Sequence, residues 1–253
     1  MAALDVGRIE IAESCLPRLL TQFPGSNRVK RLGAMIKEAK GKYEEALIDY
    51  AEILKANPAN FLAMKRKVAV YKALGDNKAA IIELHELIKV NAGDLSSWVE
   101  LSELHLSLCD YTSAAFCVEE IILLNPVSAA SHCRLAEIYY TMGGVTNLIN
   151  ARKHYSTSLS FQTVRSGNLR ALYGLLLTCR SLECLKSSMS LEVVSEHATT
   201  NRALEENQPV TVELNKWSLE QLQMLNEQFS SVTSVSTNSI LAQALTAFGA
   251  ALP

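Results

Sequence analysis

The sequence lacks the patterns that mark secreted, disulfide-bonded and membrane-spanning proteins. Its 253 residues contain no Asn-x-Ser/Thr acceptor for glycosylation, and its six cysteines form no Cys-x-x-Cys pair. No run approaches the ~18 to 20 apolar residues that would span a bilayer. Charges at Asp5, Arg8 and Glu10 interrupt the region where a signal peptide would be apolar. These absences predict a soluble protein of a reducing compartment, with no direct membrane span.

Signatures of catalysis and of ligand binding are also absent. The five histidines show no His-x-x-x-His spacing, and Gly143-Gly144 lacks the Lys-Ser/Thr that completes a phosphate-binding loop. Free cysteine packs as a small hydrophobe, which predicts a packing role for all six cysteines. We therefore expect no enzyme activity, no metal and no cofactor.

Net charge is small, but the charges are unevenly distributed. The chain has 24 basic and 26 acidic residues, a net charge of −2, which argues against a nucleic-acid-binding surface. Residues 28–89 hold 13 Lys or Arg against 8 Asp or Glu, whereas residues 90–133 hold six acids and no Lys or Arg. This asymmetry has two interpretations: ordinary solvated faces, or two docking surfaces for partners of opposite charge.

What the sequence does contain is a repeat with a period of about 34 residues. The segment YTSAAFCVEEIILLNP (Tyr111 to Pro126) has the same skeleton as YEEALIDYAEILKANP (Tyr43 to Pro58), which lies two periods earlier. Stepping along the chain by one period aligns five columns of similar residues. The columns are Gly7, Gly41, Gly75 and Cys109; Ala12, Ala46, Ala80 and Ala114; Leu16, Tyr50, Leu84 and Val118; Leu19, Ile53, Leu87 and Ile121; and Pro24, Pro58, Ala92 and Pro126.

Each copy of the repeat has the pattern of two helices joined by a short turn. Apolar residues follow helical spacing, Gly or Asp-Tyr interrupts them near the middle, and Pro ends the second helix. A helix–turn–helix unit with a period of about 34 residues is typical of tetratricopeptide repeats. His105 and His132 replace aromatic residues of that pattern, so we expect them to be packed rings. The sequence predicts an all-α fold, a tetratricopeptide-repeat right-handed superhelical solenoid of antiparallel helix pairs.

The repeats divide the chain into four predicted parts. Residues 1–26 form an incomplete first repeat that lacks most of its first helix, so we expect an N-terminally shortened form. Residues 27–166 hold the tetratricopeptide repeats, and residues 167–229 a further helical repeat with a capping helix. Residues 230–253 are expected to be a disordered or weakly ordered tail.

Several boundaries within these parts are also predicted. The second helix of the first repeat should run from Ile9 to Phe23. A three-residue insertion in the fourth copy should be absorbed by a loop at Gly143 to Asn147. The C-terminal part should hold separate helices at Asn168 to Leu185, Ser187 to Asn207 and Val212 to Phe229.

Candidate binding residues follow from the faces of these helices. Four basic residues fall where the first helices face the inner groove, which predicts that the groove receives an acidic or helical segment of a partner. They are Arg28, Arg31, Lys65 and Lys72. Glu100 and Glu103 make the first helix of the next repeat acidic. Phe116 and Leu123 lie seven residues apart on a helix face that is usually exposed, so they form either a docking edge or a contact buried by an adjacent helix.

A chaperone-binding adaptor is the alternative function for such a scaffold. Some tetratricopeptide proteins grip C-terminal carboxylates of chaperones with paired Asn and Lys or Arg residues on the first helices. The equivalent positions here include Arg31, Lys65 and Glu100, without any Asn. A soluble co-chaperone adaptor that binds peptide segments therefore stays as the alternative reading.

The chain also resembles a known family along about Ala3 to Leu177. It is similar to the second subunit of the ER membrane protein complex, a tetratricopeptide protein family. The matching segments are FPGSNRVKRL, KRKVAVYKALG, DYTSAAFCVEEIILLNP, YYTMGGVTNLINARKHYSTSL and NLRALYGL. The resemblance implies a non-enzymatic scaffold on the cytoplasmic face of the endoplasmic reticulum membrane, held there by partner subunits and supporting membrane-protein insertion. Its implied partners are membrane-embedded subunits and a soluble subunit of the eight/nine type, with no nucleic acid.

Overall fold

The described residues of the protein are helical. The computed structural model describes residues 2–163, 167–189 and 198–232, and within these ranges it contains helices and no strand. The helices are α1 (Ala2–Asp5), α2 (Ile9–Gln22), α3 (Asn27–Ala39), α4 (Tyr43–Ala56), α5 (Phe61–Leu74), α6 (Asn77–Val90), α7 (Leu95–Ser107), α8 (Tyr111–Leu124), α9 (Ala129–Met142), α10 (Val145–Phe161), α11 (Leu169–Met189) and α12 (Ala198–Val232). The predicted all-α tetratricopeptide-repeat solenoid is confirmed as a fold class.

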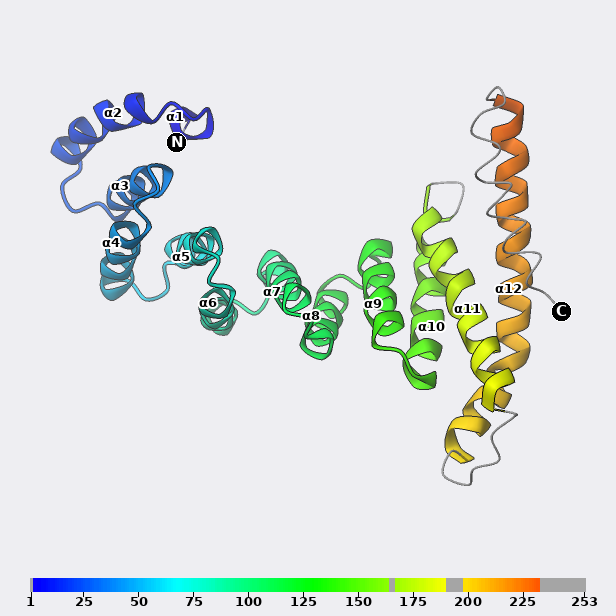
Figure 1. Ribbon diagram of the computed structural model, residues 1–253. Helices are drawn as coiled ribbons and strands as arrows, with labels where there is room; N and C mark the ends of the chain where they lie inside the picture. The colour runs from blue at the N-terminus through cyan, green and yellow to red at the C-terminus, as the bar shows by residue number, and fades with distance from the viewer. Residues whose placement is uncertain (1, 164–166, 190–197, 233–253) are drawn as a thin grey trace. The chain divides into compact units, whose positions relative to one another are not determined.

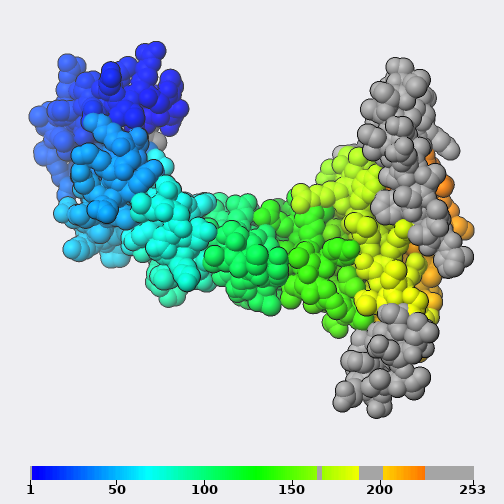
Figure 2. All heavy atoms as spheres, in the orientation of Figure 1, coloured from blue at the N-terminus to red at the C-terminus, as the bar shows by residue number. Residues whose placement is uncertain are grey.

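The chain forms two compact units, Met1–Leu108 and Cys109–Pro253. The first unit contains α1 to α7 and the second contains α8 to α12, and successive helices within each unit run in opposite directions (Figure 1). The division falls inside the third copy of the repeat, within the predicted array of residues 27–166. In the space-filling view, side chains close the space between neighbouring ribbons within each unit (Figure 2).

Helix starts and turns repeat with the same period as the sequence. The side chains of Asn60, Asp94 and Ser128 accept a hydrogen bond from the third backbone N–H after them, at 3.3, 3.0 and 3.3 Å, and so cap α5, α7 and α9. The turn between the helices of a pair needs a left-handed residue. Gly75 has φ 76° there, and Cys109, at the same position one repeat later, has φ 58°.

The alanine column lies in the second helices and is fully buried. Ala46, Ala80, Ala114 and Ala151 all have no exposed surface. At Ala46, Ala80 and Ala151, whose helices pack against the preceding helix of the same unit, a larger side chain would disturb that packing, because folded cores have no spare volume. The predicted register of the repeat is therefore confirmed at these four residues.

The insertion in the fourth copy lies in a helix rather than in a loop. The predicted loop from Gly143 to Asn147 is wrong, because α10 begins at Val145. Gly143 and Gly144, with φ of 71° and 79°, complete the turn in two residues. The three additional residues lengthen α10 to 17 residues, against 14 in α8. Val145 is buried there in a cluster with Leu182, which fixes the extra turn.

The C-terminal part has two long helices where three were predicted. Residues 198–207 and 212–229, expected in separate helices, belong to α12, which continues through Pro209. Its buried positions keep helical spacing across the proline. They are Leu204, Thr211, Asn215, Ser218 and Leu222. Because this face packs continuously, a break at Pro209 would expose it. The first three residues of the predicted tail are helical, and residues 233–253 lie outside the described part of the chain.

A buried arginine holds α12 at the proline. Arg152 of α10 is only 4% exposed, and its guanidinium donates hydrogen bonds to the backbone oxygen of Asn207 at 3.0 Å, to Asn207 Oδ1 at 2.7 Å and to Thr211 Oγ1. Pro209 has no N–H and so removes one helical hydrogen bond nearby. The arginine thus ties α10 to the residues on both sides of Pro209, and each such charged hydrogen bond contributes about 1.5 to 3 kcal/mol.

We predict that Gly174→Ala destabilises the protein. A Cβ at Gly174 in α11 would lie 2.3 Å from Cζ of Tyr155, whose ring is buried in the core at 3% exposure and can move only by unpacking it. The expected cost is about 1 to 3 kcal/mol, measured by urea unfolding. Gly33→Ala is the matched control, because its Cβ would meet only Leu16, at 3.7 Å. The control should stabilise the protein by about 0.5 to 1 kcal/mol through helix propensity. A change of the unfolding free energy in the same direction for both variants would contradict the packing argument.

Candidate partner-binding surfaces

The first helices of the N-terminal unit carry basic side chains. Arg28 and Arg31 lie on α3, and Lys65 and Lys72 on α5, as the sequence predicted. Lys72 is paired within the unit, since its Nζ lies 3.3 Å from Glu100 of α7. Lys65 is paired too, with its Nζ 2.8 Å from Asp94 at the start of α7. Two of the four predicted groove residues are thus engaged by the chain itself.

The contact with Lys65 lowers the pKa of Asp94 at the start of α7. Partial burial raises the pKa of Asp94, but hydrogen bonds from Lys65, Ser97 and Ser96 outweigh it, so the pKa lies below its ordinary value. Asp94 therefore stays ionised at neutral pH. Sequence reasoning missed this pairing because it treated neighbouring charges of opposite sign as separate surfaces, although α5 and α7 are equivalent helices of adjacent repeats. Pairs as exposed as these contribute about 0 to 1 kcal/mol each.

Arg28 and Arg31 differ from the two lysines. Neither has an ion-pair partner within the residues that the structure describes. Arg28 is exposed and Arg31 is half-buried. The basic surface available to a partner therefore centres on α3. Glu103 of α7 is exposed on the acidic helix and also has an interaction within the chain.

The predicted apolar edge on α8 is exposed. Phe116 is 55% exposed and Leu123 is 73% exposed, so neither is buried by an adjacent helix. The position of Phe116 is occupied by Ile82 of α6 one period earlier and by Ile48 of α4 two periods earlier, and these are 63% and 62% exposed. Sequence reasoning missed these two residues, although the repeat period points directly to them. The placement of Phe116 and Leu123 as a docking edge stays a prediction.

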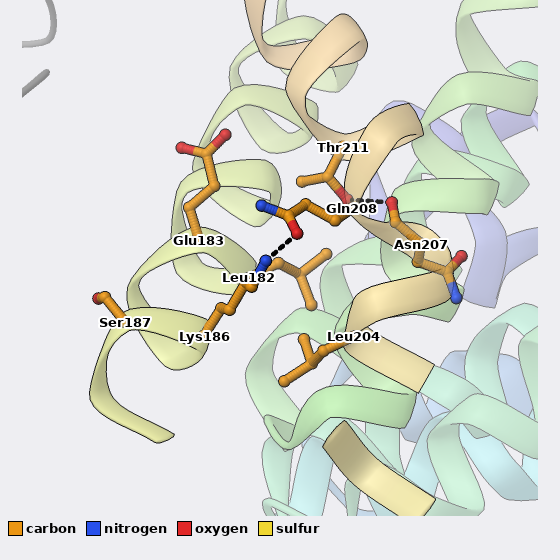
Figure 3. A pocket seen from close by; sticks show the side chains of 8 residues that line it. All are labelled: Leu182, Glu183, Lys186, Ser187, Leu204, Asn207, Gln208 and Thr211. Atoms are coloured by element: carbon orange, nitrogen blue, oxygen red, sulfur yellow. Dashed lines mark hydrogen bonds between the residues drawn. The ribbon is translucent and has the colours of Figure 1, made fainter. Parts of the chain in front are cut away.

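A cavity lies between α11 and α12 in the C-terminal unit (Figure 3). Its volume is about 310 Å³, and it is lined by Leu182, Glu183, Lys186, Ser187, Leu204, Asn207, Gln208 and Thr211. Its polar groups already have partners: Lys186 donates to Gln208, and Glu183 accepts both bonds of the Asn215 amide, at 3.0 and 3.1 Å. The cavity is thus a gap between α11 and α12, whose polar side chains there already form hydrogen bonds within the chain.

Thiol and metal chemistry have little support in the described residues. Burial raises the pKa of Cys117 and of Cys133 to about 11, so both thiols stay protonated near neutral pH. Cys15, Cys109 and Cys184 are exposed, so the expectation that all six cysteines pack internally is wrong for these three. Within the same residues, no three His, Cys, Asp or Glu side chains gather closely enough to hold a metal.

Two histidines contact each other where α9 packs against α10. Nδ1 of His132 lies 3.1 Å from Nδ1 of His154, and Nε2 of His132 lies 3.0 Å from the backbone oxygen of Pro126. A carbonyl only accepts, so Nε2 of His132 carries the proton and its Nδ1 accepts from His154. His132 is 7% exposed, which confirms that it is a packed ring.

The comparisons with known proteins identify the family. A model of the EMC2 TPR-like repeat domain matches residues 12–160, more than half of the chain. The chain belongs to the EMC2 family of TPR-like proteins. Subunit 2 of the ER membrane protein complex from Xenopus tropicalis is 47% identical over 178 residues, and subunit 2-B from Xenopus laevis is 46% identical over the same length. The matches cover 70% of this chain and 59% of each relative, so the chain spans less than two thirds of their length.

Solved structures support the same fold. The crystal structure of MamA protein aligns with a TM-score of 0.53 at 18% identity, over 83% of this chain and 96% of that one. A chain in the structure of Naa15/Naa10 bound to HypK-THB aligns with a TM-score of 0.58 at 15% identity, over 98% of this chain and 37% of that one. At these identities, the likeness concerns the fold alone.

Each of the described helices is too short or too polar to cross a membrane.

We predict that acid destabilises the C-terminal unit through the histidine pair. Burial lowers the pKa of His154, and the neighbouring His132 lowers it further, while Glu119 opposes and Lys153 adds to the effect. Because the folded pKa lies below the unfolded value of about 6.5, this stability is complete above that pH and is lost as the pH falls through it. The melting temperature should drop by a few degrees between neutral pH and pH 5.5. His154→Gln should make that drop smaller, and an unchanged drop would contradict the assignment.

Proposed function

We propose that this chain is a non-catalytic scaffold subunit of the ER membrane protein complex. It would sit on the cytoplasmic face of the endoplasmic reticulum membrane, hold cytosolic parts of membrane-embedded subunits and bind a soluble subunit of the eight/nine type. In this way it would support insertion of membrane proteins. The observation that carries the proposal is the family match over residues 12–160, together with relatives that are named as subunit 2 of that complex.

Features of the described helices support a scaffold role. Helix α8 displays the exposed apolar residues Phe116 and Leu123, and Arg28 and Arg31 of α3 have no ion-pair partner among the described residues. Exposed apolar residues beside charges are typical of protein-binding surfaces. The alternative, a co-chaperone adaptor, would use cations of the first helices, but Lys65 and Lys72 already pair with Asp94 and Glu100.

Co-purification tests the proposal. The tagged full chain would be recovered from detergent-solubilised membranes and, in parallel, from the cytosolic fraction. Subunits of the ER membrane protein complex in the membrane sample would support the scaffold function. Recovery of chaperones without those subunits would favour the adaptor instead.

We predict that the double variant Phe116→Ser/Leu123→Ser releases a partner while the chain stays folded. Both side chains are largely exposed, so circular dichroism should show unchanged helicity. Loss of two apolar anchors should weaken recovery of that partner by about tenfold or more. Ile48→Ser/Ile82→Ser is the matched control, since it removes equally exposed residues at the repeated position. Equal losses in both variants would show that α8 has no special role.

We also predict that Arg28 and Arg31 contribute more to partner binding than Lys65 and Lys72. The lysines are neutralised within the chain by Asp94 and Glu100, whereas the arginines are not paired in this way. Arg28→Gln/Arg31→Gln should weaken association and flatten its dependence on salt, because screening acts on the remaining exposed charges. Lys65→Gln/Lys72→Gln should change the strength of association and its salt dependence less. The reverse order would show that the lysines leave their ion pairs to bind the partner.

A further inference from the structure

One side of α12 carries a row of exposed apolar side chains. The opposite side of the helix packs against α10 and α11 (Figure 1). Seven residues make nearly two helical turns, so residues spaced by seven lie in one row. The row consists of Val210, Trp217 and Met224, which are 48%, 38% and 49% exposed. Exposed apolar residues that gather in this way, rather than singly, are typical of binding surfaces.

An acidic row runs beside the apolar one. Glu206, Glu213 and Glu220 also recur every seven residues, and all three are exposed. Glu206 pairs with Arg202, at 2.8 Å. Glu213 and Glu220 have no ion-pair partner among the residues for which the structure gives side chains. Along the helix, these carboxylates alternate with the apolar side chains. The surface therefore offers contacts to apolar and to cationic groups at the same time.

An apolar pocket opens beside Trp217, in the middle of the apolar row. Its volume is about 310 Å³, and it is lined by Ser156, Leu159, Ser160, Leu175, Leu214 and Trp217, from α10, α11 and α12. An engineered apolar cavity of about half this volume binds benzene in another protein. The pocket thus has room for one large apolar side chain placed against the indole ring.

We propose that this side of α12 binds a basic amphipathic helix of a partner protein. Docking the apolar face of a helix onto an apolar surface is a common mode of recognition. Apolar residues of the partner helix contact Val210, Trp217 and Met224, and one of them enters the pocket. Its Lys or Arg side chains pair with Glu213 and Glu220, which selects this partner over an uncharged or acidic helix. To follow the whole row, the partner helix needs about four turns.

Charge separates this partner from other occupants of the same surface. Residues 203–224 hold four Glu and one Lys, so the outer side of α12 is acidic. A second copy of the chain would set like charges of two α12 helices against each other, which disfavours association. Residues 228–253 contain no Lys or Arg that could pair with Glu213 and Glu220. The same carboxylates repel the phosphates of nucleic acids and of anionic lipids.

Binding of two synthetic helical peptides to the isolated full chain tests the proposal. Both peptides have about 20 residues and carry Leu in one row at the same positions. One has Lys and the other has Glu at every charged position. Fluorescence anisotropy should show that the Lys peptide binds about tenfold or more tightly than the Glu peptide, with an affinity that falls as salt rises. Equal affinities, or no binding of the Lys peptide, would overturn the proposal.

Charge reversal on α12 shows whether the peptide binds at this site. Glu213→Lys/Glu220→Lys should weaken binding of the Lys peptide by about tenfold or more and strengthen binding of the Glu peptide. Glu44→Lys/Glu52→Lys on α4 is the matched control, since it changes the net charge equally at exposed positions. The control should leave both affinities near those of the parent chain, and circular dichroism should show unchanged helicity in both variants. Equal effects of the two double variants would overturn the proposal.

Tryptophan fluorescence gives a readout at the site itself. The protein has two tryptophans, and Trp98 is already buried at 9% exposure. The Lys peptide should shift the emission to shorter wavelength as it covers Trp217, and Trp217→Phe should abolish that shift. Binding without a shift, or a shift that persists in Trp217→Phe, would overturn the proposal. Because the isolated chain and a synthetic peptide suffice, a failure here is distinct from a failure to co-purify with the ER membrane protein complex.

Discussion

The rest of the structure depends on one contact, the close approach of two antiparallel helices at a small residue. Ala46, Ala80 and Ala151 have no exposed surface, and each lies in the second helix of a pair that packs together within one unit. Because the residue is small, the larger side chains on either side of it can interdigitate. Gly174 extends the same principle to α11, where the ring of Tyr155 occupies the space that a Cβ would take. Helix spacing in both units follows from these residues.

Electrostatic contacts then connect one repeat to the next. The basic α5 and the acidic α7 are equivalent helices of adjacent repeats, and Lys65–Asp94 and Lys72–Glu100 join them. Each pair is too exposed to add much stability. They do neutralise the lysines of α5, whereas Arg28 and Arg31 of α3 have no ion-pair partner among the described residues.

The C-terminal unit departs from the regular repeat. Helices α10, α11 and α12 are longer than those before them, and α12 passes through Pro209 without ending. Arg152 supports this segment, because its buried guanidinium ties Asn207, just before the proline, to α10. The same long helix leaves Val210, Trp217 and Met224 exposed on the side that does not pack against α11.

The sequence by itself determined the fold class and the register and turns of the regular repeats, because those periods share the same small, apolar and left-handed positions. It also indicated a usually exposed face for Phe116 and Leu123 from their place in that period. Only the tertiary structure decided which charges pair and where the late helices begin and end. Lys72 meets Glu100 across 28 residues, and Arg152 meets Asn207 across 55. Local patterns carry no information about such distant partners, so separate helices ending at Asn207 and beginning at Val212 were predicted where the structure has the single helix α12.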